Sequence, residues 1–81
     1  MATLNQTKIR NPKELGKIIR NRRKELGFTQ EFFARQVPCS PRFLGEVENG
    51  KAGANIATVI KIIMLLGMDM YIEPRDSKLG C

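Results

Sequence analysis

Lysine and arginine are the commonest side chains in this sequence that could do chemistry. The 81 residues include 14 lysines and arginines against 8 aspartates and glutamates, which gives a net charge of +6 and an isoelectric point near 9.8. Eight of these cations lie between Lys8 and Lys24, where Glu14 is the one acid. Such a concentration of charge fits a protein that meets phosphate groups or another acidic surface. A helix face that is simply solvated would have the same composition.

Catalytic chemistry finds little support in the sequence. It contains no histidine for general base catalysis, no glycine-rich phosphate loop and no pair of acids suited to a cleft. Cys39 and Cys81 do not form a Cys-x-x-Cys pair and have no histidine to complete a zinc site. We therefore expect a protein that is not an enzyme and that uses no cofactor and no metal.

The length favours one small domain. Hydrophobic residues make up 42% and charged residues 27%, as in soluble globular proteins. The longest apolar run, residues 62–66, is much shorter than a membrane span, and the first residues lack the features of a signal peptide. We therefore expect a cytoplasmic protein with no membrane segment.

Capping residues and apolar residues at helical spacing predict four helices. The capping residues are Asn11, Thr29, Ser40 and Asn55. Asn11 and Glu14 have the spacing of a capping box. Gly27, Pro38 and Gly50 end the first three helices. The predicted helices span about 12–26, 30–36 and 41–48, with a fourth that begins at 56 and runs up to Gly67.

The first three helices each have one apolar face. The residues expected on these faces are Leu15, Ile18, Ile19 and Leu26, then Phe33, Ala34 and Val37, then Phe43, Leu44 and Val47. The fourth helix is apolar on all sides, whereas its three neighbours can cover only about one face. We expect the remaining face, with Ile60, Met64 and Leu65, to meet a second subunit.

The residues after the fourth helix have a different period. Met68, Met70 and Ile72 alternate with polar residues before Pro74, which predicts a β-strand over 68–74. A lone strand has no partner within the chain, so we expect it to pair antiparallel with the same strand of a twofold-related copy. The predicted dimerisation residues are Ile60, Met64, Leu65, Met70 and Ile72. The predicted division is a flexible arm (1–10), a helical domain (11–67), a dimerisation strand (68–74) and a flexible tail (75–81).

The second and third predicted helices are joined by a very short turn and flanked by two further helices, which is the arrangement of a helix-turn-helix. In this motif one helix crosses the phosphate backbone, and the next inserts its N-terminal residues into the major groove of DNA. Residues 41–48 would form the helix in the groove.

Several segments strengthen this interpretation. They are Arg23-Lys24-Glu25-Leu26-Gly27-Phe28-Thr29-Gln30, Ala34, Ser40-Pro41-Arg42-Phe43-Leu44 and Glu46-Val47-Glu48-Asn49-Gly50-Lys51. They resemble the helix-turn-helix of the xenobiotic-response-element family, which includes the lambda-type phage repressors and Cro proteins, over about residues 12–68. Within this family the chain looks most like the HipB-type antitoxins, because of the predicted strand and the Leu66–Ile72 run. The resemblance implies an all-α, compact four-helix lambda-repressor-like domain with a short C-terminal β-strand paired across a homodimer.

The resemblance also implies which residues contact DNA bases. They are Ser40, Pro41, Arg42 and Glu46. The guanidinium of Arg42 can read guanine bidentately, and the carboxylate of Glu46 can accept a hydrogen bond from cytosine. The alternatives are that Arg42 contacts phosphate only and that Glu46 pairs with a lysine. Pro41 cannot hydrogen-bond a base through its side chain, and helix initiation is its expected role.

Three further residues match family contacts to phosphate: Gln30, Asn49 and Lys51. Gln30 could equally be a polar residue of a first helical turn, and Asn49 a simple helix terminator. Arg23 and Glu48 occupy positions that the family uses for a partly buried ion pair, which holds the third helix against the first.

The sequence departs from the family pattern at three positions. Pro38 stands where a glycine usually opens the turn, and proline cannot adopt a positive φ, so the turn geometry is open. Cys39 replaces a small aliphatic residue and is expected to be a buried core thiol. Phe32 replaces a polar residue, and either a partner contact or local packing would explain it.

We therefore expect a homodimeric, sequence-specific transcriptional repressor that binds double-stranded DNA at a palindromic operator. A HipB-like protein would also bind a HipA-like kinase toxin and repress their shared operon. One alternative is a free-standing phage or host regulator without a toxin. Another is a protein-interaction module whose basic first helix binds an acidic partner.

Overall fold

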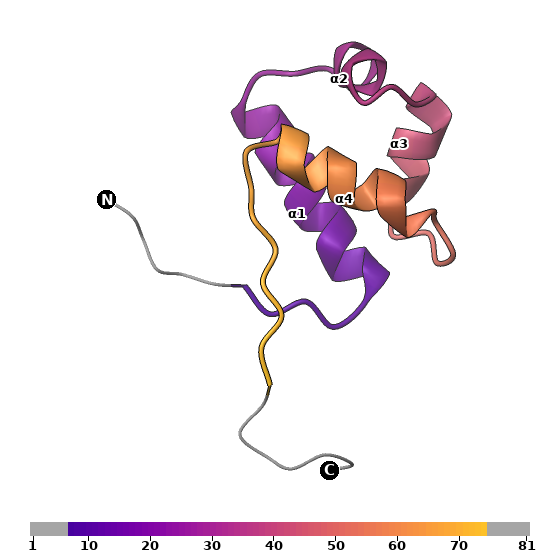
Figure 1. Ribbon diagram of the computed structural model, residues 1–81. Helices are drawn as coiled ribbons and strands as arrows, with labels where there is room; N and C mark the ends of the chain where they lie inside the picture. The colour runs from indigo at the N-terminus through magenta and orange to yellow at the C-terminus, as the bar shows by residue number, and fades with distance from the viewer. Residues whose placement is uncertain (1–6, 75–81) are drawn as a thin grey trace.

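The computed structural model describes residues 7–74, whose regular secondary structure consists of helices. These helices are α1 (Pro12–Glu25), α2 (Gln30–Gln36), α3 (Pro41–Glu48) and α4 (Ile56–Leu65). In Figure 1, α4 crosses α1, while α2 and α3 lie together at one end of the molecule. The predicted four-helix, all-α fold is confirmed. No helix in the described part of the chain has the length and apolar character to span a bilayer.

The helices begin where the capping residues predict. The side-chain oxygens of Asn11, Thr29, Ser40 and Asn55 each accept a hydrogen bond from the backbone N–H three residues later, at 2.9 to 3.1 Å. The capping box at α1 is only half formed, because the carboxylate of Glu14 accepts from the backbone N–H of Arg10 (2.7 Å) instead of that of Asn11. Gly27 and Gly50 follow α1 and α3 with φ of 82° and 85°, which a side chain would disfavour.

All four helices contribute to one apolar core. Its buried residues are Ile19, Phe33, Ala34, Val37, Leu44, Val47, Val59, Ile62, Ile63 and Leu66. Leu15 and Phe43 are partly buried against this core, as is Phe28. The prediction for Leu26 was wrong: it is exposed, because it caps the C-terminus of α1 and lies beyond the turn that packs on the core.

The predicted strand is not supported. Residues 68–74 have no regular secondary structure, and Ile72 is 96% exposed. Alternating apolar and polar residues make two different faces, but a strand forms only when its backbone N–H and C=O groups find a partner. The described part of the chain offers none to this segment. Residues 1–6 of the predicted arm and the whole of the predicted tail lie outside the described residues.

The turn between α2 and α3 carries two of the unusual residues. The Val37–Pro38 peptide is cis, and the backbone N–H of Cys39 donates to the carbonyl of Ala34 at 2.7 Å. Cys39 is half-buried against the core, less than expected for a core thiol, and this burial raises its pKa. Phe32 is 45% exposed, and its ring lies 5.3 Å from that of Phe28, so local packing accounts for part of its surface.

Candidate nucleic-acid interface

Helix α3 has one inner and one outer face. Leu44, Val47 and Glu48 point inward and are buried. The outer face carries Pro41, Arg42, Gly45, Glu46 and Asn49, at the spacing of a single helix side. Four of the seven predicted DNA-contacting residues therefore share one exposed or half-exposed surface.

The charged residues on this surface are linked to each other. Arg42 Nε lies 3.4 Å from Glu46 Oε2, and Lys51 Nζ lies 3.2 Å from Glu46 Oε1. The hydrogen bond from Lys51 and the positive charges of Lys51 and Arg42 lower the pKa of Glu46. The side chain of Arg42 is 88% exposed, so the contact with Glu46 is a weak surface pair that a ligand can replace. The structure thus shows the lysine pairing considered for Glu46, with arginine as a second partner.

Behind the outer face, a buried ion pair holds α3 against α1. Arg23 Nε and Nη2 donate to the two carboxylate oxygens of Glu48 at 2.6 and 3.0 Å, and both side chains are more than nine-tenths buried. Arg23 Nη1 also donates to the carbonyl of Phe28 at 2.7 Å. Bidentate geometry and full hydrogen bonding are the conditions under which a buried pair fixes an orientation.

Gln30 belongs to the same network, a role that its position in the sequence did not indicate. Its Nε2 donates to Glu48 Oε1 at 3.0 Å, so the first residue of α2 is tied to the last residue of α3. The bond positions Gln30 beside Gly45 on the outer face of α3. The sequence contains Arg23, Gln30 and Glu48, but it does not show that the side chain of Gln30 reaches from the start of α2 to the end of α3.

Two glycines allow α1 to approach α3 closely. A Cβ on Gly16 would overlap the carbonyl oxygen of Val47 and lie 2.6 Å from that of Glu48. A Cβ on Gly50 would lie 2.6 Å from Cα of Lys13. The beginning of α1 therefore packs directly on the end of α3, which leaves little room for α3 to shift relative to the core.

Predicted contacts also lie at the two ends of α3, where the outer face begins and ends. Ser40 uses its hydroxyl to cap α3, and Pro41 is the first residue of that helix. Asn49 is exposed and caps the C-terminus of α3, which leaves its side chain accessible. Lys51 follows on an exposed loop. Gln30, Ser40 and Lys51 thus border the outer face of α3, while the predicted dimerisation residues lie elsewhere, on α4 and the segment after it.

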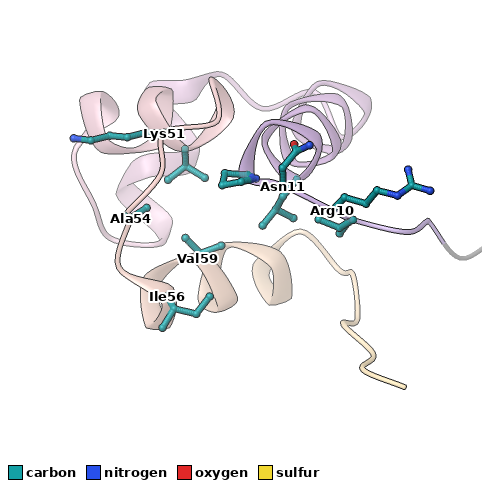
Figure 2. A pocket seen from close by; sticks show the side chains of 11 residues that line it. Arg10, Asn11, Lys51, Ala54, Ile56 and Val59 are labelled. Atoms are coloured by element: carbon teal, nitrogen blue, oxygen red, sulfur yellow. The ribbon is translucent and has the colours of Figure 1, made fainter. Parts of the chain in front are cut away.

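A pocket of about 320 Å³ lies at the beginning of α1, between the start of this helix, the loop after α3 and the start of α4. Its lining is mostly apolar, with Leu15, Val47 and Val59 among the residues. Figure 2 shows the charged ends of Arg10 and Lys51 pointing away from the pocket. Residues 7–74 do not include a cluster of acids and cysteines that could hold a metal ion.

Solved structures similar to this chain in fold include a HipA-HipB-O2-O3 complex (TM-score 0.77) and a HipB-O4 20mer complex (TM-score 0.76). Each is 23% identical to this chain, and each match covers 85% of this chain and 97% of the other. The ImmF control region 10 kDa protein of Bacillus phage phi105 is 30% identical over 60 residues, which are 74% of this chain and 67% of the phage protein.

The HTH_3 helix-turn-helix family matches residues 19–71, a region that includes α2, the turn, α3 and α4. This match covers more than half of the chain and contains the whole outer face of α3. The protein belongs to the HTH_3 family of helix-turn-helix DNA-binding regulators.

Proposed function

We propose that the protein is a sequence-specific transcriptional repressor that lays the outer face of α3 into the major groove of DNA. The observation that carries this proposal is the contrast between the two faces of α3. The inner face is fixed by the Arg23–Glu48 pair, whereas Arg42 on the outer face is exposed and held only by a weak contact with Glu46. A rigid helix that presents a free guanidinium suits bidentate recognition of guanine.

In this proposal each predicted contact has a defined role. Arg42 and Glu46 contact base edges, and Ser40 and Pro41 lie at the start of α3 where the helix approaches the groove. Gln30, Asn49 and Lys51 bind phosphates on either side. When DNA binds, Arg42 and Lys51 exchange their bonds to Glu46 for contacts with DNA. The negative charge of Glu46 also repels phosphate groups near these two cations.

We further propose that the repressor is a homodimer formed through α4 and the segment after it. Met64 is 67% exposed on α4, and Ile60, Leu65, Met70 and Ile72 are exposed as well. Large apolar side chains left exposed on α4 and on the segment after it are typical of an interface. A twofold dimer would place two copies of α3 on successive major grooves of a palindrome.

An antitoxin role would add a protein partner. The fold is similar to that of HipB in a complex that contains HipA, which supports a proposal that this protein binds a HipA-like kinase toxin and represses the operon of both. A kinase gene next to the gene of this protein would favour this role. Copurification of the two gene products would test it directly.

A free-standing phage or host regulator is the second candidate. The 30% identity to a control-region protein of Bacillus phage phi105 favours it. The two candidates share the DNA-binding mechanism and differ in the partner. The absence of a kinase gene nearby, together with phage genes on either side, would select this alternative.

The repressor proposal can be tested by titrating the purified protein against DNA from upstream of its own gene and against a scrambled duplex, each at two salt concentrations. A repressor binds the upstream DNA tightly, with a clear preference over the scrambled duplex and with strong salt dependence. Equal and weak binding to both duplexes would contradict the proposal and favour a protein-interaction module.

A further inference from the structure

A row of cations runs along one exposed side of α1. It consists of Lys13, Lys17, Arg20 and Lys24, which we call the α1 basic stripe. The residues follow one another at intervals of four, three and four positions, so their side chains project from the same side of the helix. Within the part of the chain that the structure describes, none of the four takes part in a salt bridge.

The two acids of α1, Glu14 and Glu25, have partners outside this stripe. Glu14 lies 4.0 Å from Arg10, and Glu25 lies 3.0 Å from Arg22. The positive charge of the stripe is therefore uncompensated. Its arrangement also works against helix stability, because like charges four residues apart repel and because Lys13 stands in the first turn, where the helix dipole disfavours a cation.

The stripe begins beside the predicted phosphate contacts of α3. Gly50 lies directly against Cα of Lys13, and this glycine stands between Asn49 and Lys51. Further along α1, Gly16 rests on the last carbonyls of α3 and Arg23 is bound to Glu48. The stripe thus begins at the border between α1 and α3, beside Asn49 and Lys51, and runs along α1 on a side next to the one that contacts α3.

The length of the stripe matches several phosphates of one DNA strand. Eleven residues separate Lys13 from Lys24, which corresponds to about 16 Å along the axis of an α-helix. One strand of B-DNA carries a phosphate about every 3.4 Å of its axis, so the stripe is long enough to reach more than one phosphate of a strand.

We propose that the α1 basic stripe binds phosphates of the DNA backbone outside the bases that α3 contacts. This inference rests on the proposed function, and it adds a second, sequence-independent DNA-binding surface to it. An acidic protein surface is the weaker candidate, because protein interfaces have an apolar or aromatic centre and the exposed residue beside the stripe is the polar Asn21.

The test compares two double variants that lose the same charge. Lys17→Gln/Arg20→Gln removes half of the stripe, while Arg35→Gln/Lys61→Gln removes two exposed cations from α2 and α4. Affinity for a random duplex of about three helical turns is measured over a series of salt concentrations. Thermal unfolding of both variants checks that the fold is retained, as expected for exposed positions.

The stripe variant should reduce the slope of log K against log salt concentration by about two, because each lost phosphate contact removes about 0.9. The control variant should leave the slope near that of the wild type. Both variants should keep the wild-type ratio of affinities for upstream and random DNA, because phosphate contacts carry no sequence information.

An unchanged slope in the stripe variant would overturn the inference. An equal reduction of the slope in both variants would also overturn it, because it would reflect net charge alone. These results leave the proposed function intact if the wild type still prefers its upstream DNA. Conversely, a wild type without that preference contradicts the proposed function, while a reduced slope in the stripe variant would still support the phosphate contacts. If the wild type binds neither duplex, both proposals fail.

Discussion

Two regions of the molecule differ in how many of their side chains find partners within one chain. One is the contact between α1, α2 and α3, and the other is the exposed side of α4. Around α3, Arg23, Gln30 and Glu48 form a closed network, and no buried side-chain nitrogen or oxygen in residues 7–74 lacks a hydrogen-bond partner. On α4, Met64 and Leu65 are exposed although they are large and apolar. The polar groups of the first region are satisfied within a single chain, whereas the second leaves large apolar side chains exposed. This difference separates residues that set the shape of the proposed DNA-binding surface from residues that we assign to the proposed dimer interface.

Breaking the network around Glu48 should have the largest effect. Glu48→Ala leaves the guanidinium of Arg23 buried and unpaired, and we expect the free energy of unfolding to fall by about 3–5 kcal/mol. Urea denaturation would measure the loss. The double variant Arg23→Met/Glu48→Leu should lose much less, because no charge stays buried. A similar loss in both variants would show that packing, and not charge pairing, holds α3 in place.

The close approach of α1 and α3 should also be sensitive to one methyl group. Gly16→Ala forces a Cβ into the carbonyls at the end of α3, and we expect it to cost about 1–3 kcal/mol of stability. Gly45→Ala is the matched control, because its Cβ would lie 3.7 Å from the Gln30 side chain, an ordinary contact. Because alanine is a better helix former than glycine, Gly45→Ala should leave the free energy of unfolding unchanged or slightly higher. Thermal unfolding distinguishes the two, and equal effects would contradict the described packing.

Polar substitutions on the exposed apolar side should affect assembly and spare the fold. For Met64→Gln/Ile72→Gln we expect about a tenfold loss of affinity for a palindromic site, equal to about 1.4 kcal/mol, with affinity for a half-site unchanged. Phe32→Gln, an exposed apolar residue on α2, is the control and should change neither. Sedimentation would follow the oligomeric state. A wild type that stays monomeric at micromolar concentration would contradict the dimer.

Removing the charge of Glu46 should have the smallest effect. Glu46→Gln releases Arg42 and Lys51 from their shared partner, and we expect affinity for a random duplex to rise about threefold, within the range of weak surface pairs. Glu73→Gln loses an exposed acid outside the site and serves as the control. Equal gains in both variants would indicate a general effect of net charge and would remove the specific role of Glu46.

Much of the fold could be predicted from the sequence because it depends on local signals. Asn11, Thr29, Ser40 and Asn55 cap the helices through bonds to residues only three positions away, and such short-range chemistry is visible in a sequence. The strand prediction at Met70 and Ile72 failed for the opposite reason. A strand requires a distant partner, and alternation of residue types does not supply one.

The candidate site divides in the same way. The position of Arg42 on the outer face of α3 follows from helical spacing and from Ser40 and Pro41 at its start. The bond of Gln30 to Glu48 could not be predicted, because it depends on how three helices cross. The pairing of Glu46 depends partly on local spacing and partly on the fold. Arg42 is four residues away on the same helix, so its contact follows from helical spacing, whereas Lys51 lies beyond the end of the helix.

Base recognition by α3 is the central claim, and Arg42 tests it most directly. The measurement compares wild type and Arg42→Ala on the upstream DNA and on variants with single base pairs exchanged. We predict that Arg42→Ala lowers affinity for the upstream DNA by about 1–3 kcal/mol and loses discrimination at one G·C pair, while discrimination at the other pairs persists. Unchanged affinity, or an equal loss on every duplex, would contradict base recognition by Arg42.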